Sequence, residues 1–102
     1  MPLSFIFNIN SFSMFSVAIV ISGLFSVYLR ALWYDAKGDW EKAHAIAQSV
    51  TGEDAAWVHG YLHRKEGDLS NSAYWYSRAG RNKSTLSLEA EWEEIVNTLL
   101  KK

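Results

Sequence analysis

The sequence has no cysteine and only one proline, and no charged residue occurs before Arg30. Without cysteine, the chain has no disulfide framework, no thiolate metal site and no cysteine nucleophile. From Arg30 onward, ten basic side chains nearly balance eleven acidic ones, so no net field attracts nucleic acid. The composition therefore excludes nucleic acid as a partner and indicates no cofactor, but it does not name a reaction.

The 102 residues divide into two blocks of different composition. All five phenylalanines lie at or before Phe25, whereas all five tryptophans and all five tyrosines lie at or after Tyr28. This split predicts an apolar N-terminal segment, residues 1–27, and a helical domain, residues 28–102. The domain is near the lower size limit for an unaided core, and its large aromatic side chains offset this by burying much surface.

Residues 12–29 contain no charge, and thirteen of the eighteen are apolar. Such a run is long enough to cross a bilayer as a helix, so we expect a membrane anchor. Arg30, Lys37 and Lys42 follow the run, and no basic residue precedes it. The positive-inside rule then places the helical domain at the cytoplasmic face of a membrane, and without a span the protein is expected in the cytoplasm.

Three other interpretations of the apolar segment stay open. A cleaved signal peptide needs a basic start, which the residues before Phe12 lack. A helix of the folded domain is a second interpretation, because Leu24 begins an apolar stripe at helical spacing that continues to Leu32. The third is an extended reading frame, in which residues 1–13 or more precede the true start at Met14 or another site.

The second block reads as five helices with a stop or start signal at nearly every end. We predict helices over residues 24–37, 40–50, 53–66, 69–79 and 86–100. Gly38, Gly67 and Gly80 follow three of them and are suited to the left-handed conformation that ends a helix. Asp39 and Asp68 stand where an N-cap is needed. The sequence therefore predicts an all-α fold.

A Gly-Asp junction occurs twice, at Gly38-Asp39 and Gly67-Asp68, with an offset of 29 residues. An apolar residue follows each junction, and a small residue comes three positions later. This pattern resembles the tetratricopeptide repeat, in which such a turn joins two antiparallel helices, although the usual period is about 34. We therefore expect a short array of antiparallel helix hairpins, capped by the helix over residues 86–100.

Four longer strings carry a closer resemblance. They are ALWYDAKGDWEKAH (31–44), AWVHGYLHRKEGD (56–68), NSAYWYSRAG (71–80) and EWEEIV (91–96). Together they resemble a small bacterial family of compact, tetratricopeptide-like helical proteins, over roughly residues 28–100. Members of that family generally lack a long apolar leader, so the resemblance does not extend to residues 1–27.

Three histidines are candidate metal ligands. His59 and His63 are four residues apart and share a helical face, which is the spacing that zinc-binding helices use. With His44 on a neighbouring helix they would supply three imidazoles. The residue after His59 is Gly60 rather than glutamate, so the zinc-protease signature is absent. The alternative interpretation is that these imidazoles stack on tryptophan and tyrosine as part of the core.

Aromatic and arginine side chains indicate a binding surface. We expect Tyr76 in the core, whereas Trp75 and Arg78 share another helical face, expected beside Tyr61 and Arg64 of the preceding helix. Tryptophan, tyrosine and arginine are enriched at the energetic centres of protein interfaces. The predicted binding surface comprises His59, Tyr61, His63, Arg64, Trp75 and Arg78.

The function that we expect is a protein- or peptide-interaction module, tethered to a membrane if the apolar segment spans one. A metal-binding or enzymatic site on His44, His59 and His63 is the first alternative. A purely structural small protein is the second. No catalytic residue is assigned, and the sequence specifies neither the partner nor the oligomeric state.

Overall fold

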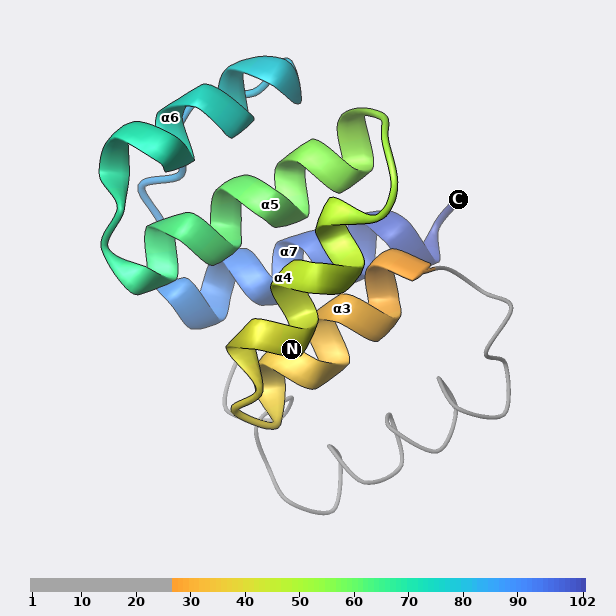
Figure 1. The fold of residues 1–102 in the computed structure, drawn as a ribbon. Coiled ribbons are helices and arrows are strands. Elements are labelled where there is room, and N and C mark those ends of the chain that lie inside the picture. Colours follow the sequence, from red (N-terminus) through yellow and green to blue (C-terminus); the bar gives the residue numbers. More distant parts are fainter. Residues whose placement is uncertain (1–26) are drawn as a thin grey trace.

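The structure, a computed structural model, describes residues 27–102 of the 102-residue chain (Figure 1). Its five helices are α3 (Val27–Ala36), α4 (Trp40–Gln48), α5 (Glu53–Glu66), α6 (Leu69–Arg78) and α7 (Leu88–Leu100). No strand occurs within this range, so the predicted all-α fold of five helices is confirmed.

Most of the apolar segment, and most of the membrane span predicted over residues 12–29, lies outside the described residues, and residues 27–29 form the start of α3. Within residues 27–102, no helix combines the length and the apolar character that crossing a bilayer requires.

The two Gly-Asp junctions form the turns that the sequence predicts. Gly38 and Gly67 have φ values of 90° and 88°, which glycine adopts without the steric cost of a Cβ. The Asp39 side chain caps α4 by accepting a hydrogen bond from the Lys42 amide. The Asp68 side chain caps α6 in the same way. These turns fold α3 with α4 and α5 with α6 into two hairpins.

Two helix boundaries differ from the predicted ones by two residues, and the ends of α3 and α6 each come one residue earlier than predicted. Helix α7 begins at Leu88 rather than at residue 86, because the Ser87 hydroxyl accepts a hydrogen bond from the Ala90 amide at 3.1 Å and caps the helix there. Helix α4 ends at Gln48 rather than at residue 50, where the Ser49 hydroxyl donates to the Ile46 carbonyl at 2.7 Å. In both places a serine hydroxyl bonds to the backbone at the end of the helix.

Helix α5 is the centre of the domain. Its residues from Ala55 to His63 are all buried, so it has no solvent-facing stripe over that stretch. Among the described helices, α5 packs against all four others, whereas α4 and α6 both pack on α5 without contacting each other. Helix α7 packs against α3 and α5. The core is therefore arranged around one central helix.

Two of the indole N–H groups tie helices together by bonding to backbone carbonyls of another helix. The Trp40 Nε1 atom donates to the Leu62 carbonyl of α5 at 2.8 Å. The Trp92 Nε1 atom of α7 donates to the Leu32 carbonyl of α3 at 3.0 Å. The buried Trp92 ring and the half-buried Trp40 ring thus each keep a partner for their polar atom.

Gly60 lets α6 approach α5 closely. A Cβ on Gly60 would lie 3.2 Å from the Tyr76 backbone nitrogen and 3.4 Å from the Ser72 carbonyl oxygen. The Ser72 hydroxyl also donates to the Gly60 carbonyl at 2.9 Å, which holds the two backbones at this separation. Any side chain larger than hydrogen must therefore displace backbone atoms of α6.

We expect Gly60→Val to lower the free energy of unfolding by about 2 kcal/mol, because forcing methyl groups into a packed contact costs about 1–3 kcal/mol. The measurement is urea denaturation followed by tryptophan fluorescence. Ala45→Val is the control, because Ala45 is exposed on α4, and it should change stability by only a few tenths of a kcal/mol. If the Gly60→Val protein is as stable as the control, α6 does not pack as closely on Gly60 as the structure shows.

Candidate functional site

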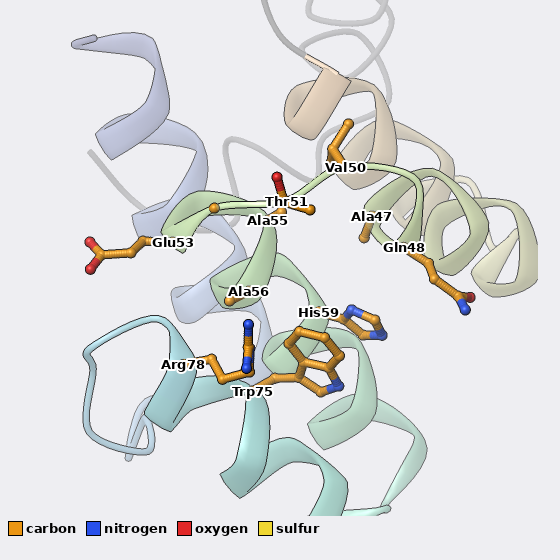
Figure 2. A pocket seen from close by; sticks show the side chains of 11 residues that line it. Ala47, Gln48, Val50, Thr51, Glu53, Ala55, Ala56, His59, Trp75 and Arg78 are labelled. Atoms are coloured by element: carbon orange, nitrogen blue, oxygen red, sulfur yellow. The ribbon is translucent and has the colours of Figure 1, made fainter.

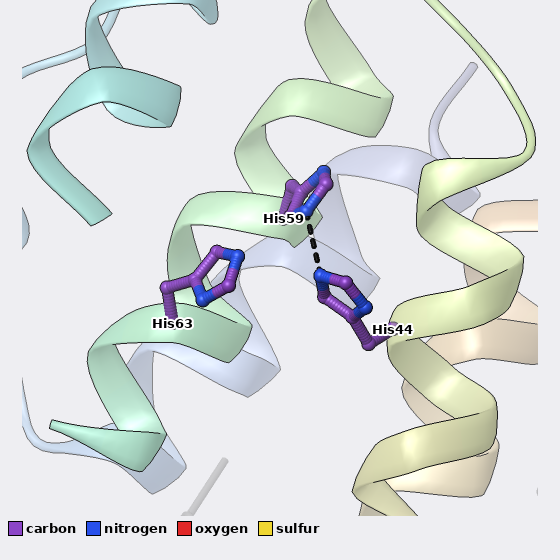
Figure 3. A group of neighbouring side chains, drawn as sticks. All are labelled: His44, His59 and His63. Carbon is purple, nitrogen blue, oxygen red and sulfur yellow. Dashed lines mark hydrogen bonds between the residues drawn. The ribbon is translucent and has the colours of Figure 1, made fainter. Parts of the chain in front are cut away.

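The structure brings His44, His59 and His63 together between α4 and α5 (Figure 3). The Nε2 atoms of His44 and His59 lie 2.9 Å apart, so one imidazole donates to the other. The ring of His63 has its centroid 5.0 Å from each of the other two rings. We call these three residues the histidine cluster. The connection over residues 49–52 creates it, because it returns the chain so that α4 packs beside the face of α5 that carries the other two histidines.

Tryptophan rings flank the histidine cluster on both sides. The Trp40 ring stacks on His44 with centroids 4.8 Å apart, and the Trp75 ring stacks on His59 at 4.0 Å. The expectation that the imidazoles stack on tryptophan is therefore confirmed for two of them. These indoles cover one face of the His44 ring and one face of the His59 ring.

A carboxylate orients the third imidazole. One oxygen of Glu66 lies 2.6 Å from the Nδ1 atom of His63, one turn further along α5. A charged acceptor at this distance fixes the proton of a neutral imidazole on Nδ1. The Nε2 atom of His63 then has its lone pair available within the cluster.

Burial keeps part of the cluster uncharged. Desolvation, followed by the charges of His44 and His63, lowers the pKa of His59 to about 4. Desolvation and the neighbouring His63 also lower the pKa of His44. At neutral pH both imidazoles are therefore neutral, and each carries a nitrogen lone pair.

A groove lies on the other side of His59 (Figure 2). It has a volume of about 280 Å³, and it is bounded by the end of α4, the turn that follows, the first turns of α5, and α6. Its lining residues are Ala47, Gln48, Val50, Thr51, Gly52, Glu53, Ala55, Ala56, His59, Trp75 and Arg78. We call this the α4–α6 groove. It exists because α4 and α6 rest on α5 without touching each other.

Comparison with known proteins adds nothing to this geometry. No protein-family model, no curated protein and no solved structure matches the chain. The resemblance to the small tetratricopeptide-like family accordingly stays a prediction. Function must be inferred from the site itself.

The predicted position of Tyr61 on a binding surface is wrong. Its side chain is 2% exposed, and its hydroxyl donates to Asp35 of α3 at 3.0 Å. Burial and this carboxylate raise the pKa of Tyr61 far above its ordinary value. Lys65 completes the arrangement with an ion pair to Asp35 at 2.8 Å. Tyr61 faces α3 rather than α6, and it serves the core.

Arg64 also lies away from the predicted surface. Its guanidinium pairs with Glu91 of α7 at 2.7 Å and donates a second hydrogen bond to the Leu86 carbonyl. Of the six predicted surface residues, only Trp75, Arg78 and His59 line the α4–α6 groove, while His63 belongs to the histidine cluster. The prediction therefore combined residues from opposite faces of α5.

Glu91 is the polar residue that the sequence analysis missed. It is one of several acids near the start of α7, yet its side chain is fully buried. Besides Arg64, it accepts hydrogen bonds from the Trp57 indole at 3.4 Å and from the Tyr76 hydroxyl. A signal was present, because Glu91 lies three residues after Leu88 and four before Ile95, on the apolar stripe of α7.

Proposed function

We propose that this chain is a small tetratricopeptide-like binding module that holds a short peptide of a partner protein in the α4–α6 groove. The observation that carries the proposal is the groove itself, of about 280 Å³, with an indole and a guanidinium on its wall. Grooves between packed helices are a recurrent way to bind a peptide.

The opposite side of the domain is partly covered by the last helix of the chain. There α7 covers α3 and α5, and Arg64 and Trp92 bind this helix to the rest of the chain. The concave surface that helical repeats usually offer to ligands is thus filled by the protein's own last helix. The α4–α6 groove is a concave surface that α7 leaves uncovered.

The lining of the groove indicates which peptide it would hold. Small side chains, among them Ala47, Ala55 and Ala56, leave space for an apolar side chain of the ligand against the Trp75 ring. The Arg78 guanidinium lies 5.8 Å from the Trp75 ring centroid and forms no ion pair within residues 27–102. An apolar residue next to an acidic one would therefore complement this wall.

A display library of random peptides, selected on the immobilised full chain, tests the proposal. We expect enriched sequences in which an apolar residue adjoins an aspartate or glutamate. Trp75→Ala should weaken binding of a synthetic enriched peptide at least tenfold, about 1.4 kcal/mol, as truncation of a central aromatic contact typically does. Arg78→Gln should weaken binding of the acidic peptide more than binding of the same peptide with asparagine or glutamine in place of the acid.

The control variant is Leu69→Ala, because Leu69 lies on the same helix, is 61% exposed and does not line the groove. It should leave the peptide affinity unchanged. Circular dichroism of every variant establishes that the fold is intact. Selection that yields no shared pattern, or a peptide that binds Trp75→Ala as tightly as the unmodified protein, would refute the proposal.

A further inference from the structure

We infer that the histidine cluster is a binding site for a divalent transition metal of the zinc class, held by His44, His59 and His63. The three residues each offer one imidazole nitrogen, and these nitrogens lie within 4.8 Å of one another. This site adjoins the α4–α6 groove and shares His59 with it, but the inference does not rest on the proposed peptide binding. The ligand set of three nitrogens and no thiolate suits Zn²⁺, Ni²⁺ or Cu²⁺.

The distances are close to what a tetrahedral ion needs. Zinc–nitrogen bonds of about 2.0–2.1 Å place two ligand nitrogens about 3.4 Å apart. The His44 and His59 nitrogens are 2.9 Å apart, slightly closer than this, and no pair of ligand atoms is separated by more than 4.8 Å. Side-chain rotations that shift the nitrogens by about 1 Å would gather all three around one ion, without movement of α4 or α5.

Glu66 provides a second, independent feature of a metal site. Metal-binding histidines almost always donate their other ring N–H to a carboxylate, a carbonyl or a water, which fixes the tautomer and the ring orientation. His63 makes this contact with Glu66 at 2.6 Å through Nδ1. Its Nε2 atom is thereby the nitrogen presented to the metal.

The surroundings also suit an ion with three protein ligands. Trp40 and Trp75 stack on the rings of His44 and His59 and form an apolar wall around the ligands. Of the three histidines, His44 is the one that is half-exposed, so an ion can enter from the α4 side. Three protein ligands leave the fourth position of a tetrahedral ion for water or for another ligand.

A neighbouring group of possible ligands is less suitable. It consists of His63, Glu66 and Asp68, whose ligand atoms also lie within 4.8 Å of one another. Asp68, however, already caps α6 by accepting a hydrogen bond from the Asn71 amide. Glu66 and Asp68 are both exposed, and exposed carboxylates are stable in contact with water, without a metal ion. The cluster of three imidazoles is therefore the site that we assign.

The test is calorimetric titration of ZnCl₂ into the full chain, prepared without a polyhistidine tag and first treated with a chelator. We expect one ion per chain with a Kd below about 1 µM, and a melting temperature higher by about 5 °C when Zn²⁺ is in excess. Cobalt titration should give the visible absorption bands of tetrahedral Co²⁺. His44→Gln and His59→Gln should each weaken zinc binding at least a hundredfold.

Two further variants separate this site from its neighbour. Glu66→Gln should weaken binding about tenfold, because the carboxylate orients His63 without touching the ion. Asp68→Asn should leave the zinc affinity unchanged. A variant that fails to fold would also fail to bind zinc. His44 is the least buried of the three histidines, so we expect His44→Gln to fold, and circular dichroism checks this. Absence of stoichiometric zinc, or zinc binding that survives His44→Gln but not Asp68→Asn, would overturn the assignment.

Discussion

Glu91→Gln should lower the free energy of unfolding by about 3 kcal/mol or more, because removing one partner of a buried ion pair typically costs about 3–5 kcal/mol. The Glu91 carboxylate is fully buried and is shared by Arg64, Trp57 and Tyr76. Glutamine has nearly the same shape but no charge, so the Arg64 guanidinium loses its counter-ion. Small domains have a total stability of only about 5–15 kcal/mol, so this loss is a large fraction.

The measurement is urea denaturation at neutral pH, followed by tryptophan fluorescence and far-ultraviolet circular dichroism. Glu94→Gln is the matched control, because Glu94 is exposed on the same helix and the substitution is identical. We expect it to change the free energy of unfolding by less than about 0.5 kcal/mol. If Glu91→Gln and Glu94→Gln have the same stability, the buried carboxylate does not hold α7 in place.

Trp92→Ala should be at least as damaging, with a loss of about 3–5 kcal/mol. Trp92 is 1% exposed, and its removal leaves a cavity between α7 and the rest of the core. The hydrogen bond from its indole to the Leu32 carbonyl, which joins α7 to α3, disappears as well. Because the domain is small, we expect the Trp92→Ala protein to be largely unfolded at 37 °C.

Trp92→Phe separates the two contributions. It keeps an aromatic ring in the core but loses the indole N–H, so we expect a smaller loss of about 1–2 kcal/mol. Leu100→Ala serves as the control, because Leu100 lies on the same helix and is 45% exposed. Thermal denaturation followed by circular dichroism ranks the melting temperatures of the variants. If the Trp92→Ala protein has the same melting temperature as the Leu100→Ala protein, Trp92 does not have the proposed role in stability.

The features that were predicted correctly are those encoded by neighbouring residues. The turns at Gly38 and Gly67 depend on a glycine and the aspartate after it, so a window of a few residues is sufficient to identify them. His59 and His63 share a face because four residues make about one helical turn. That His44 joins them follows from the hairpin order, since α4 comes directly before α5.

The features that were predicted wrongly depend on which face of α5 meets which helix. Tyr61 and Trp75 were expected on one surface, but the direction in which α3 and α7 approach α5 decides that Tyr61 is buried. Glu91 was not among the predicted site residues, because it is one of several acids near the start of α7, where acidic side chains suit the helix dipole. Its role depends on Arg64 and Tyr76, which lie 27 and 15 residues away. No local pattern contains that information.

The contact between α3 and α7 closes the domain on itself. In an open helical repeat array each unit touches only its neighbours, so units can be gained or lost by duplication and deletion. Here the first and last described helices share a core, with Trp92 bonded to Leu32 across 60 residues of sequence. A hairpin inserted between α6 and α7 would draw these two helices apart. A fold of this kind can diversify by substitution in its groove and its histidine cluster, but it cannot lengthen by adding repeats.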